Sequence, residues 1–201
     1  MRLFKGSDIL KNDSYHPEQT DSALVTKFLK EHKLEAWIMR VLKTKENGKD
    51  VYELRNAGIG KSVVKAKTDF EGADFMVTTG DFGSLLSEVN KELTKAMESA
   101  SNENEKQMIS NYIKSFEVGD VQFHKEGSKF WVKNKSPPVE TYIGFIESYR
   151  DPAGSRSEFE GFVSMVNKEQ SVKFQNLVSN AEVLLPRLPW PKGFEKDKFL
   201  R

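Results

Sequence analysis

The chain has 201 residues and no cysteine, and its 31 Lys and Arg residues nearly balance its 30 Asp and Glu residues. This balance argues against nucleic-acid and membrane partners, because both favour a basic excess on one face of a protein. The lack of cysteine excludes disulfides and thiolate metal ligands, and it predicts a reducing, cytoplasmic compartment. No stretch approaches the roughly 18 consecutive apolar residues of a membrane span, and no apolar export signal is present.

The first half of the chain predicts one helix followed by several short strands. The helix starts near Pro17, and its apolar stripe consists of Leu24, Val25, Phe28 and Leu29. Asn47-Gly48 tolerates the positive φ of a tight turn and joins strands over 34–43 and 50–56 into a hairpin. Further strands are expected at 62–67, 75–79 and 139–148. These segments predict a small mixed or barrel-like sheet.

Three helices are predicted between the strand at 75–79 and the strand at 139–148. Asp81 is expected to cap the first, whose buried face runs to Ser99 and consists of Leu85, Leu86, Val89, Leu93 and Met97. The second covers about 105–117 and the third about 121–132. Pro137-Pro138 ends this helical region, because proline removes a hydrogen-bond donor and restricts the residue before it.

The last predicted element is a long amphipathic helix from Ser157, as its N-cap, to about Leu185. Apolar residues recur there at steps of three and four, which predicts an apolar face that needs a partner surface. Pro186 ends the helix, and Leu188-Pro189-Trp190-Pro191 predicts a stiff extended connector. The chain thus divides into an α+β unit over 1–156 and the beginning of a helical unit over 157–201.

The strand at 139–148 mixes polar groups into an apolar segment. Its period of two places Glu140, Tyr142, Gly144 and Ile146 on one face and Thr141, Ile143, Phe145 and Glu147 on the other. The residues alone leave two interpretations of Glu140 and Tyr142 open: contact with a ligand, or a strand-entry carboxylate and a half-buried tyrosine whose hydroxyl reaches water. Gly144 either lets a substrate approach closely or marks a bulge.

Other polar and aromatic residues give weaker indications of a site. Arg150 and Asp151 could orient a cleft by a salt bridge, but a charge pair ahead of proline is more typical of a turn. His124 is expected at the surface or at a boundary rather than as a metal ligand. Trp131, Trp190 and Phe130 are expected to pack against other residues. The segment Gly58-x-Gly60-Lys61 lacks the spacing of a phosphate loop and predicts a turn.

Several motifs together resemble the dipeptidyl peptidase III family of zinc exopeptidases. They are Ser136–Arg156 within 111–200, Gly127-Ser128-Lys129-Phe130-Trp131, Pro189-Trp190-Pro191 with Phe194-Glu195-Lys196-Asp197-Lys198-Phe199, and upstream Phe75-x-Val77-x-x-Gly80-Asp81 with Phe28-Leu29. The family's zinc motif, His-Glu-x-x-x-His, and its later glutamate ligand are absent. The histidines, His16, His32 and His124, are isolated, so no metal site is expected within this chain. The chain thus resembles an interior piece of the enzyme.

The resemblance implies a function for the strand at 139–148. Members of the family release dipeptides from the N-termini of short peptides, using a zinc-bound water. The family's glutamate at the position of Glu140 holds the peptide's α-ammonium, and its tyrosine at the position of Tyr142 is catalytic, donating a hydrogen bond to the scissile carbonyl. Glu140, Tyr142 and Gly144 are therefore the expected substrate-binding residues.

The resemblance also implies what this chain lacks. Residues 1–156 would form much of the substrate lobe, and 157–201 would begin the helical zinc lobe, with the remainder of the enzyme as partner. The chain by itself is then expected to bind no zinc and to be inactive. The alternative is a non-catalytic peptide-binding or scaffold module, in which an exposed sheet edge pairs with extended peptides. Continuation of the reading frame into a His-Glu-x-x-x-His helix would favour the enzyme.

Overall fold

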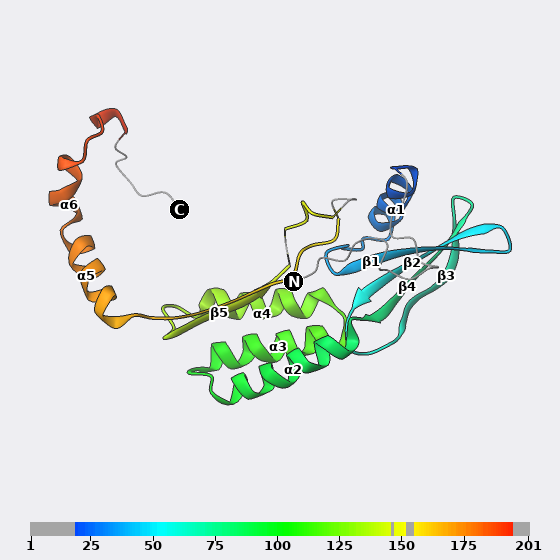
Figure 1. Ribbon diagram of the computed structural model, residues 1–201, viewed down its shortest axis with the longest axis horizontal. Helices are drawn as coiled ribbons and strands as arrows, with labels where there is room; N and C mark the ends of the chain where they lie inside the picture. The colour runs from blue at the N-terminus through cyan, green and yellow to red at the C-terminus, as the bar shows by residue number, and fades with distance from the viewer. Residues whose placement is uncertain (1–18, 146, 152–154, 195–201) are drawn as a thin grey trace.

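The computed structural model describes residues 19–145, 147–151 and 155–194, and it has an α+β fold (Figure 1). The strands are β1 (Met39–Glu46), β2 (Lys49–Ala57), β3 (Val63–Phe70), β4 (Ala73–Asp81), β5 (Val139–Gly144) and β6 (Glu160–Met165). The helices are α1 (Gln19–Glu31), α2 (Gly83–Glu98), α3 (Glu103–Val118), α4 (Val121–Lys133), α5 (Lys168–Ser179) and α6 (Ala181–Leu184). No helix in these described ranges is long and apolar enough to cross a membrane.

Four strands form a mixed sheet in the order β1-β2-β4-β3. β1 pairs antiparallel with β2, β2 parallel with β4, and β4 antiparallel with β3. The predicted mixed sheet is confirmed, although its order leaves β1 and β3 at two open edges in the described part of the chain. The Asn47-Gly48 hairpin is also confirmed, because both residues have positive φ, 52° and 82°, as a two-residue type I′ turn requires.

Helix α1 covers one face of this sheet and closes the first hydrophobic core. Phe28 is fully buried and stacks on Phe75, with ring centroids 4.3 Å apart, and Phe75 stacks in turn on Tyr52 at 4.8 Å. Asp21 of α1 accepts hydrogen bonds from the Tyr52 hydroxyl and from Lys43 Nζ. The stripe predicted for this helix therefore faces the sheet, and a partly buried ion pair between Lys43 and Asp21 joins the helix to β1.

Helices α2, α3 and α4 run side by side beyond one end of the sheet and enclose a second core (Figure 1). The three predicted helices are thus confirmed. Asn102 caps α3 by accepting from Glu105 N, and Asp120 caps α4 by accepting from Gln122 N. The prediction that Asp81 caps α2 is wrong. Phe82 is the N-cap, in a left-handed conformation without a side-chain cap, because both oxygens of Asp81 accept hydrogen bonds from Arg40.

The sheet and the helices meet at a close crossing of backbones. The turn predicted at 58–61 passes the C-terminal end of α3, where Ile59 N donates to Phe116 O at 2.8 Å and Gly60 N donates to Glu117 O at 2.9 Å. A Cβ atom on Gly58 would lie only 2.8 Å from the Cα of Gly119. Two glycines at this crossing therefore let the segment after β2 satisfy the last carbonyls of α3.

β5 does not join the four-stranded sheet, contrary to the prediction. It pairs antiparallel with β6 in a separate two-stranded sheet, from Val139↔Met165 to Gly144↔Glu160. Ile143 packs against the core of α2, α3 and α4. These helices supply the apolar partner for β5 that the sheet was expected to supply.

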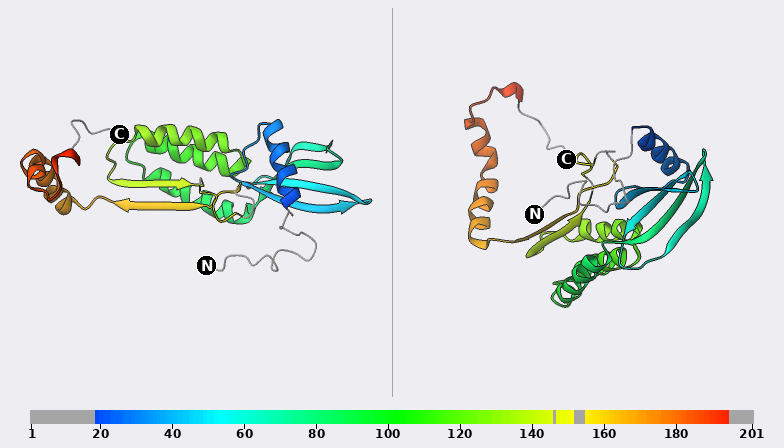
Figure 2. Two further views of the ribbon diagram at one scale, coloured as in Figure 1. Left: turned by 90° about the horizontal axis from the view of Figure 1, so that it is seen from above. Right: turned by 45° about the vertical axis from the view of Figure 1, so that its right-hand side comes forward.

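The long helix predicted over 157–185 is also wrong. Its first part is β6, and α5 begins only after Asn167, whose side chain accepts from Gln170 N as a helix cap. Ser157 is not a cap, and its backbone N–H donates to Trp37 O at 2.9 Å. The segment 160–165 forms a strand because β5 offers a free edge, and α5 and α6 then extend away from the rest of the described chain (Figures 1 and 2).

Candidate functional site

β5 places the expected site residues on the outer face of the two-stranded sheet. Glu140, Tyr142 and Gly144 alternate with Ile143, whose side chain belongs to the helical core, so the three residues face away from that core. Glu140 and Tyr142 are half-buried. Ile146, predicted on the same face, lies outside the described residues. The strand therefore holds a carboxylate and a phenol side by side on an accessible surface.

The last turn of α4 positions the carboxylate. The indole N–H of Trp131 donates a hydrogen bond of 2.7 Å to Glu140 Oε1, and the indole meets the Tyr142 ring edge-to-face at 6.1 Å. The sequence assigned Trp131 to packing and missed this contact. Its available signal was the Pro137-Pro138 turn, which folds the chain back so that the start of β5 lies beside the end of α4.

β6 supports the phenol from the other side. Phe162 pairs with Tyr142 across the strands, and the two rings stack at a centroid distance of 5.3 Å and an interplanar angle of 18°. Thr141 Oγ1 donates to Phe162 O at 2.9 Å. The Tyr142 ring thus lies between Trp131 and Phe162. Phe162 was not predicted to lie beside Tyr142, because the apolar pattern over 157–185 predicted a helix there.

Gly144 ends β5 opposite Glu160. The register between the two strands is regular as far as this pair, so Gly144 does not mark a bulge. A Cβ atom on Gly144 would lie 3.6 Å from Glu160 Oε1 and 3.8 Å from Cδ2 of Tyr142, which is ordinary contact. The glycine leaves the backbone bare beside the tyrosine.

His124 is buried, so its predicted place at the surface or at a boundary is wrong. Only 9% of the residue is exposed, and its ring stacks on Tyr112 at 5.2 Å and contacts Phe145 at 4.3 Å. Burial lowers the pKa of His124 to about 4, because the imidazolium form loses hydration. A neutral imidazole at pH 7 can pack between these rings. It joins α3, α4 and the residue that follows β5.

Arg150 and Asp151 form no ion pair with each other that bridges a cleft. Asp151 accepts hydrogen bonds from the backbone N–H groups of Ser155 and Arg156, at 3.0 and 3.3 Å. Arg150 Nε instead lies 3.3 Å from Glu158 Oε1. The turn interpretation of this charge pair fits these contacts. Trp190, beyond α6, is 44% exposed.

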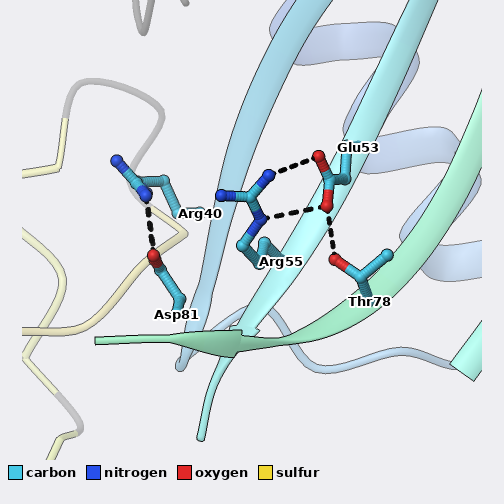
Figure 3. A network of polar contacts seen from close by, with 5 residues as sticks. All are labelled: Arg40, Glu53, Arg55, Thr78 and Asp81. Atoms are coloured by element: carbon cyan, nitrogen blue, oxygen red, sulfur yellow. Dashed lines mark hydrogen bonds and ion pairs between the residues drawn. The ribbon is translucent and has the colours of Figure 1, made fainter. Parts of the chain in front are cut away.

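A second polar network lies on the sheet face opposite α1 (Figure 3). Arg40 makes two hydrogen bonds to Asp81, at 2.6 and 2.9 Å, and so joins β1 to the end of β4. Arg55 makes two hydrogen bonds to Glu53, which also accepts from Thr78 Oγ1. The Arg55 hydrogen bonds lower the pKa of Glu53 below its ordinary value. The network connects three strands, so its contacts serve the sheet.

The described residues do not offer a zinc site. No group of three His, Cys, Asp or Glu side chains among them is placed to hold a metal ion. Of the three histidines, His32 packs on Phe28, His124 is enclosed by rings, and His16 lies outside the described residues. The groups that the outer face of β5 presents are the Glu140 carboxylate, which accepts a hydrogen bond from Trp131, and the Tyr142 phenol.

Comparison with known proteins identifies the family. The profile of peptidase family M49 matches residues 10–201. The chain is 47% identical to dipeptidyl peptidase 3 of Homo sapiens over 190 residues, which is 90% of this chain and 26% of the relative. It is 46% identical over 197 residues to dipeptidyl peptidase 3 of Nematostella vectensis, covering 91% of this chain and 27% of that protein.

A solved structure supports the fold. The structure of DPP III from Caldithrix abyssi matches with a TM-score of 0.51 and 18% identity, over 91% of this chain and 31% of that one. The chain spans about a quarter of the length of the curated relatives it matches. Because the family profile covers almost all of its sequence, this chain belongs to peptidase family M49.

Proposed function

We propose that this chain supplies the substrate-binding residues of a zinc-dependent dipeptidyl peptidase that acts on short peptides in the cytoplasm. The observation that carries the proposal is the spacing of Glu140 and Tyr142 on the outer face of β5. Strands rise about 3.4 Å per residue, so two positions on one face lie about 7 Å apart. An extended dipeptide has the same length. A peptide whose amine meets Glu140 therefore presents its second carbonyl to Tyr142.

Each side chain has a distinct part in this proposal. The Glu140 carboxylate binds the α-ammonium through a charge-assisted hydrogen bond, which sets the distance from the free end of the peptide to the cut. The Tyr142 hydroxyl donates a hydrogen bond to the carbonyl oxygen as negative charge develops on it. Trp131 orients Glu140 through its indole N–H. Gly144, which has no side chain, receives the next part of the peptide beside the Glu160 side chain.

The remainder of the site would come from other parts of the enzyme. Zinc supplies the activated water in the family, but the described side chains do not fit a zinc ion. We assign the metal, and the surface that covers α5, to the part of the enzyme that this chain does not span. The boundary expected near 152–157 would separate β6 from its partner β5, so the second lobe would instead begin after Met165, with α5 as its first helix. The chain alone should therefore hydrolyse no dipeptidyl arylamide.

Two substitutions in the complete enzyme test the proposal by steady-state kinetics on a dipeptidyl arylamide. Tyr142→Phe should lower kcat by roughly a hundredfold and leave KM within a few-fold, as expected for a donor used mainly in the transition state. Glu140→Gln should chiefly raise KM, because the ammonium is bound in ground and transition states alike. Tyr149→Phe is the matched control, since Tyr149 is 77% exposed. Full kcat in Tyr142→Phe would make Tyr142 a packing residue.

A further inference from the structure

A second carboxylate lies on the same face of the two-stranded sheet as Glu140. Glu160 begins β6 directly opposite Gly144, and its Oε1 atom lies 3.6 Å from the position of a Cβ on that glycine. The Tyr142–Phe162 pair separates the two glutamates along the strands. Glu160 and Phe162 are both exposed. The face therefore carries one carboxylate at each end of an aromatic pair.

The two strands contain no basic residue that could neutralise these carboxylates. β5 reads Val-Glu-Thr-Tyr-Ile-Gly and β6 reads Glu-Gly-Phe-Val-Ser-Met. Arg150, in the turn between the two strands, lies against Glu158, with Nε 3.3 Å from Glu158 Oε1. A cationic group that lies on this face can therefore approach either carboxylate without displacing an ion pair of β5 or β6.

The register gives these positions an order along a bound peptide. If the amine lies at Glu140 and the second carbonyl at Tyr142, the peptide runs in the same direction as β5. Gly144 lies two residues further, about 7 Å along the strand, which corresponds to the fourth residue of an extended peptide. Gly144 has no side chain to occupy this place, and the Glu160 carboxylate leans over it.

We propose that Glu160 is a specificity-determining residue that favours lysine or arginine at the fourth position of the substrate, two residues beyond the cut. This inference rests on the proposed function, because it takes the peptide's direction from Glu140 and Tyr142. Glu160 acts on the part of the peptide that leaves, and it has no contact with a substrate that ends at the scissile bond.

The test compares tetrapeptides in the complete enzyme, with release of the N-terminal dipeptide as the readout. Ala-Ala-Ala-Lys should be cut with a kcat/KM about three to five times that of Ala-Ala-Ala-Ala, the size expected for an exposed ion pair. Glu160→Gln should reduce this ratio to about one, and Glu160→Lys should favour Ala-Ala-Ala-Glu instead. Glu182→Gln, on the exposed helix α6, is the control and should leave the ratio unchanged.

A dipeptidyl arylamide separates failure of this inference from failure of the proposed function. The arylamide has no fourth residue for Glu160 to contact. The Glu160→Gln variant should therefore hydrolyse the arylamide with a kcat/KM within about twofold of that of the parent enzyme. If the parent cuts the arylamide and all tetrapeptides but Glu160→Gln keeps the preference for lysine, Glu160 has no such role. If the parent releases no dipeptide from any substrate, the proposed function and this inference are both overturned.

Discussion

Trp131 Nε1 lies 2.7 Å from Glu140 Oε1, and this hydrogen bond joins the last turn of α4 to the second residue of β5. The helix is fixed by its packing on α3, and the strand is fixed by Ile143 in the same core. Glu140 therefore has its side chain held from a rigid element. A carboxylate oriented before the ligand arrives loses less conformational entropy on binding.

Removal of the indole donor should weaken substrate binding. In the complete enzyme, Trp131→Phe keeps an aromatic ring beside Tyr142 but loses the hydrogen bond to Glu140. We expect kcat/KM for a dipeptidyl arylamide to fall about three- to tenfold, the range for one hydrogen bond, with most of the change in KM. Trp190→Phe is the control, because Trp190 lies on the connector beyond α6. An unchanged KM in Trp131→Phe would show that Glu140 is positioned without the indole.

The glycine crossing should be sensitive to a single methyl group. Gly58→Ala would place a Cβ atom 2.8 Å from Gly119 Cα and 2.9 Å from Gly119 N, and backbone atoms of a packed helix end have little room to move. Overpacking of this kind costs about 1 to 3 kcal/mol and should lower Tm by roughly 5 °C. Gly161→Ala is the matched control, since nothing lies within 4 Å of its Cβ position. Equal Tm values for both variants would contradict the close crossing.

The burial of His124 should make the fold sensitive to acid. Its pKa is about 4 in the folded chain against an ordinary value of 6.5, so the unfolded chain takes up a proton at a higher pH. Stability is therefore lost as pH falls from 6.5 towards 4. The pKa difference between the unfolded and the folded chain sets the size of this loss. The loss in unfolding free energy is on the order of 2 kcal/mol, once the remaining contact of the ring with solvent is allowed for.

Urea unfolding at pH 7 and pH 4.5 measures this loss, with His124→Phe as the comparison. Phenylalanine keeps a ring between Tyr112 and Phe145 and cannot be protonated, so its unfolding free energy should change less between the two pH values. Carboxylates titrate in both proteins, and the comparison removes their common contribution. A pH dependence that is the same in both proteins would exclude His124 as the source.

The exposed face of α5 should cause the isolated chain to associate. Leu177 and Val178 lie three and four residues after Phe174 on one face of α5, and each of the three side chains is more than half exposed. Apolar patches of this kind drive self-association. Sedimentation velocity should show association that increases with concentration, together with binding of a hydrophobic dye. Phe174→Glu combined with Leu177→Glu should reduce both, and a parent chain that stays a clean monomer without dye binding would contradict this prediction.

Local sequence signals determined the elements that are stabilised by their own neighbours in the chain. The stripe of Leu24, Val25, Phe28 and Leu29 predicts α1, and Asn47-Gly48 predicts the β1–β2 hairpin through its positive φ values. The apolar periods of α2, α3 and α4 also match the structure, except that Leu85, predicted on the buried face of α2, is 65% exposed. Alternation along 139–144 placed Glu140 and Tyr142 on one face, and the contact of Ile143 with the helical core agrees with that assignment.

Tertiary structure decided the features in which two distant segments compete for the same partner. Residues 160–165 have a helical apolar period, but the backbone groups of β5 need a neighbour, and pairing with them makes this segment β6. Asp81 is a good helix cap by composition, yet the charge of Arg40 attracts its carboxylate more strongly than the backbone of α2 does. The contacts of Trp131 with Glu140 and of Phe162 with Tyr142 also depend on which segments pack beside β5. The sequence by itself therefore determined the local elements and the polar face of β5, whereas the partners of that face depend on long-range packing, which no local period encodes.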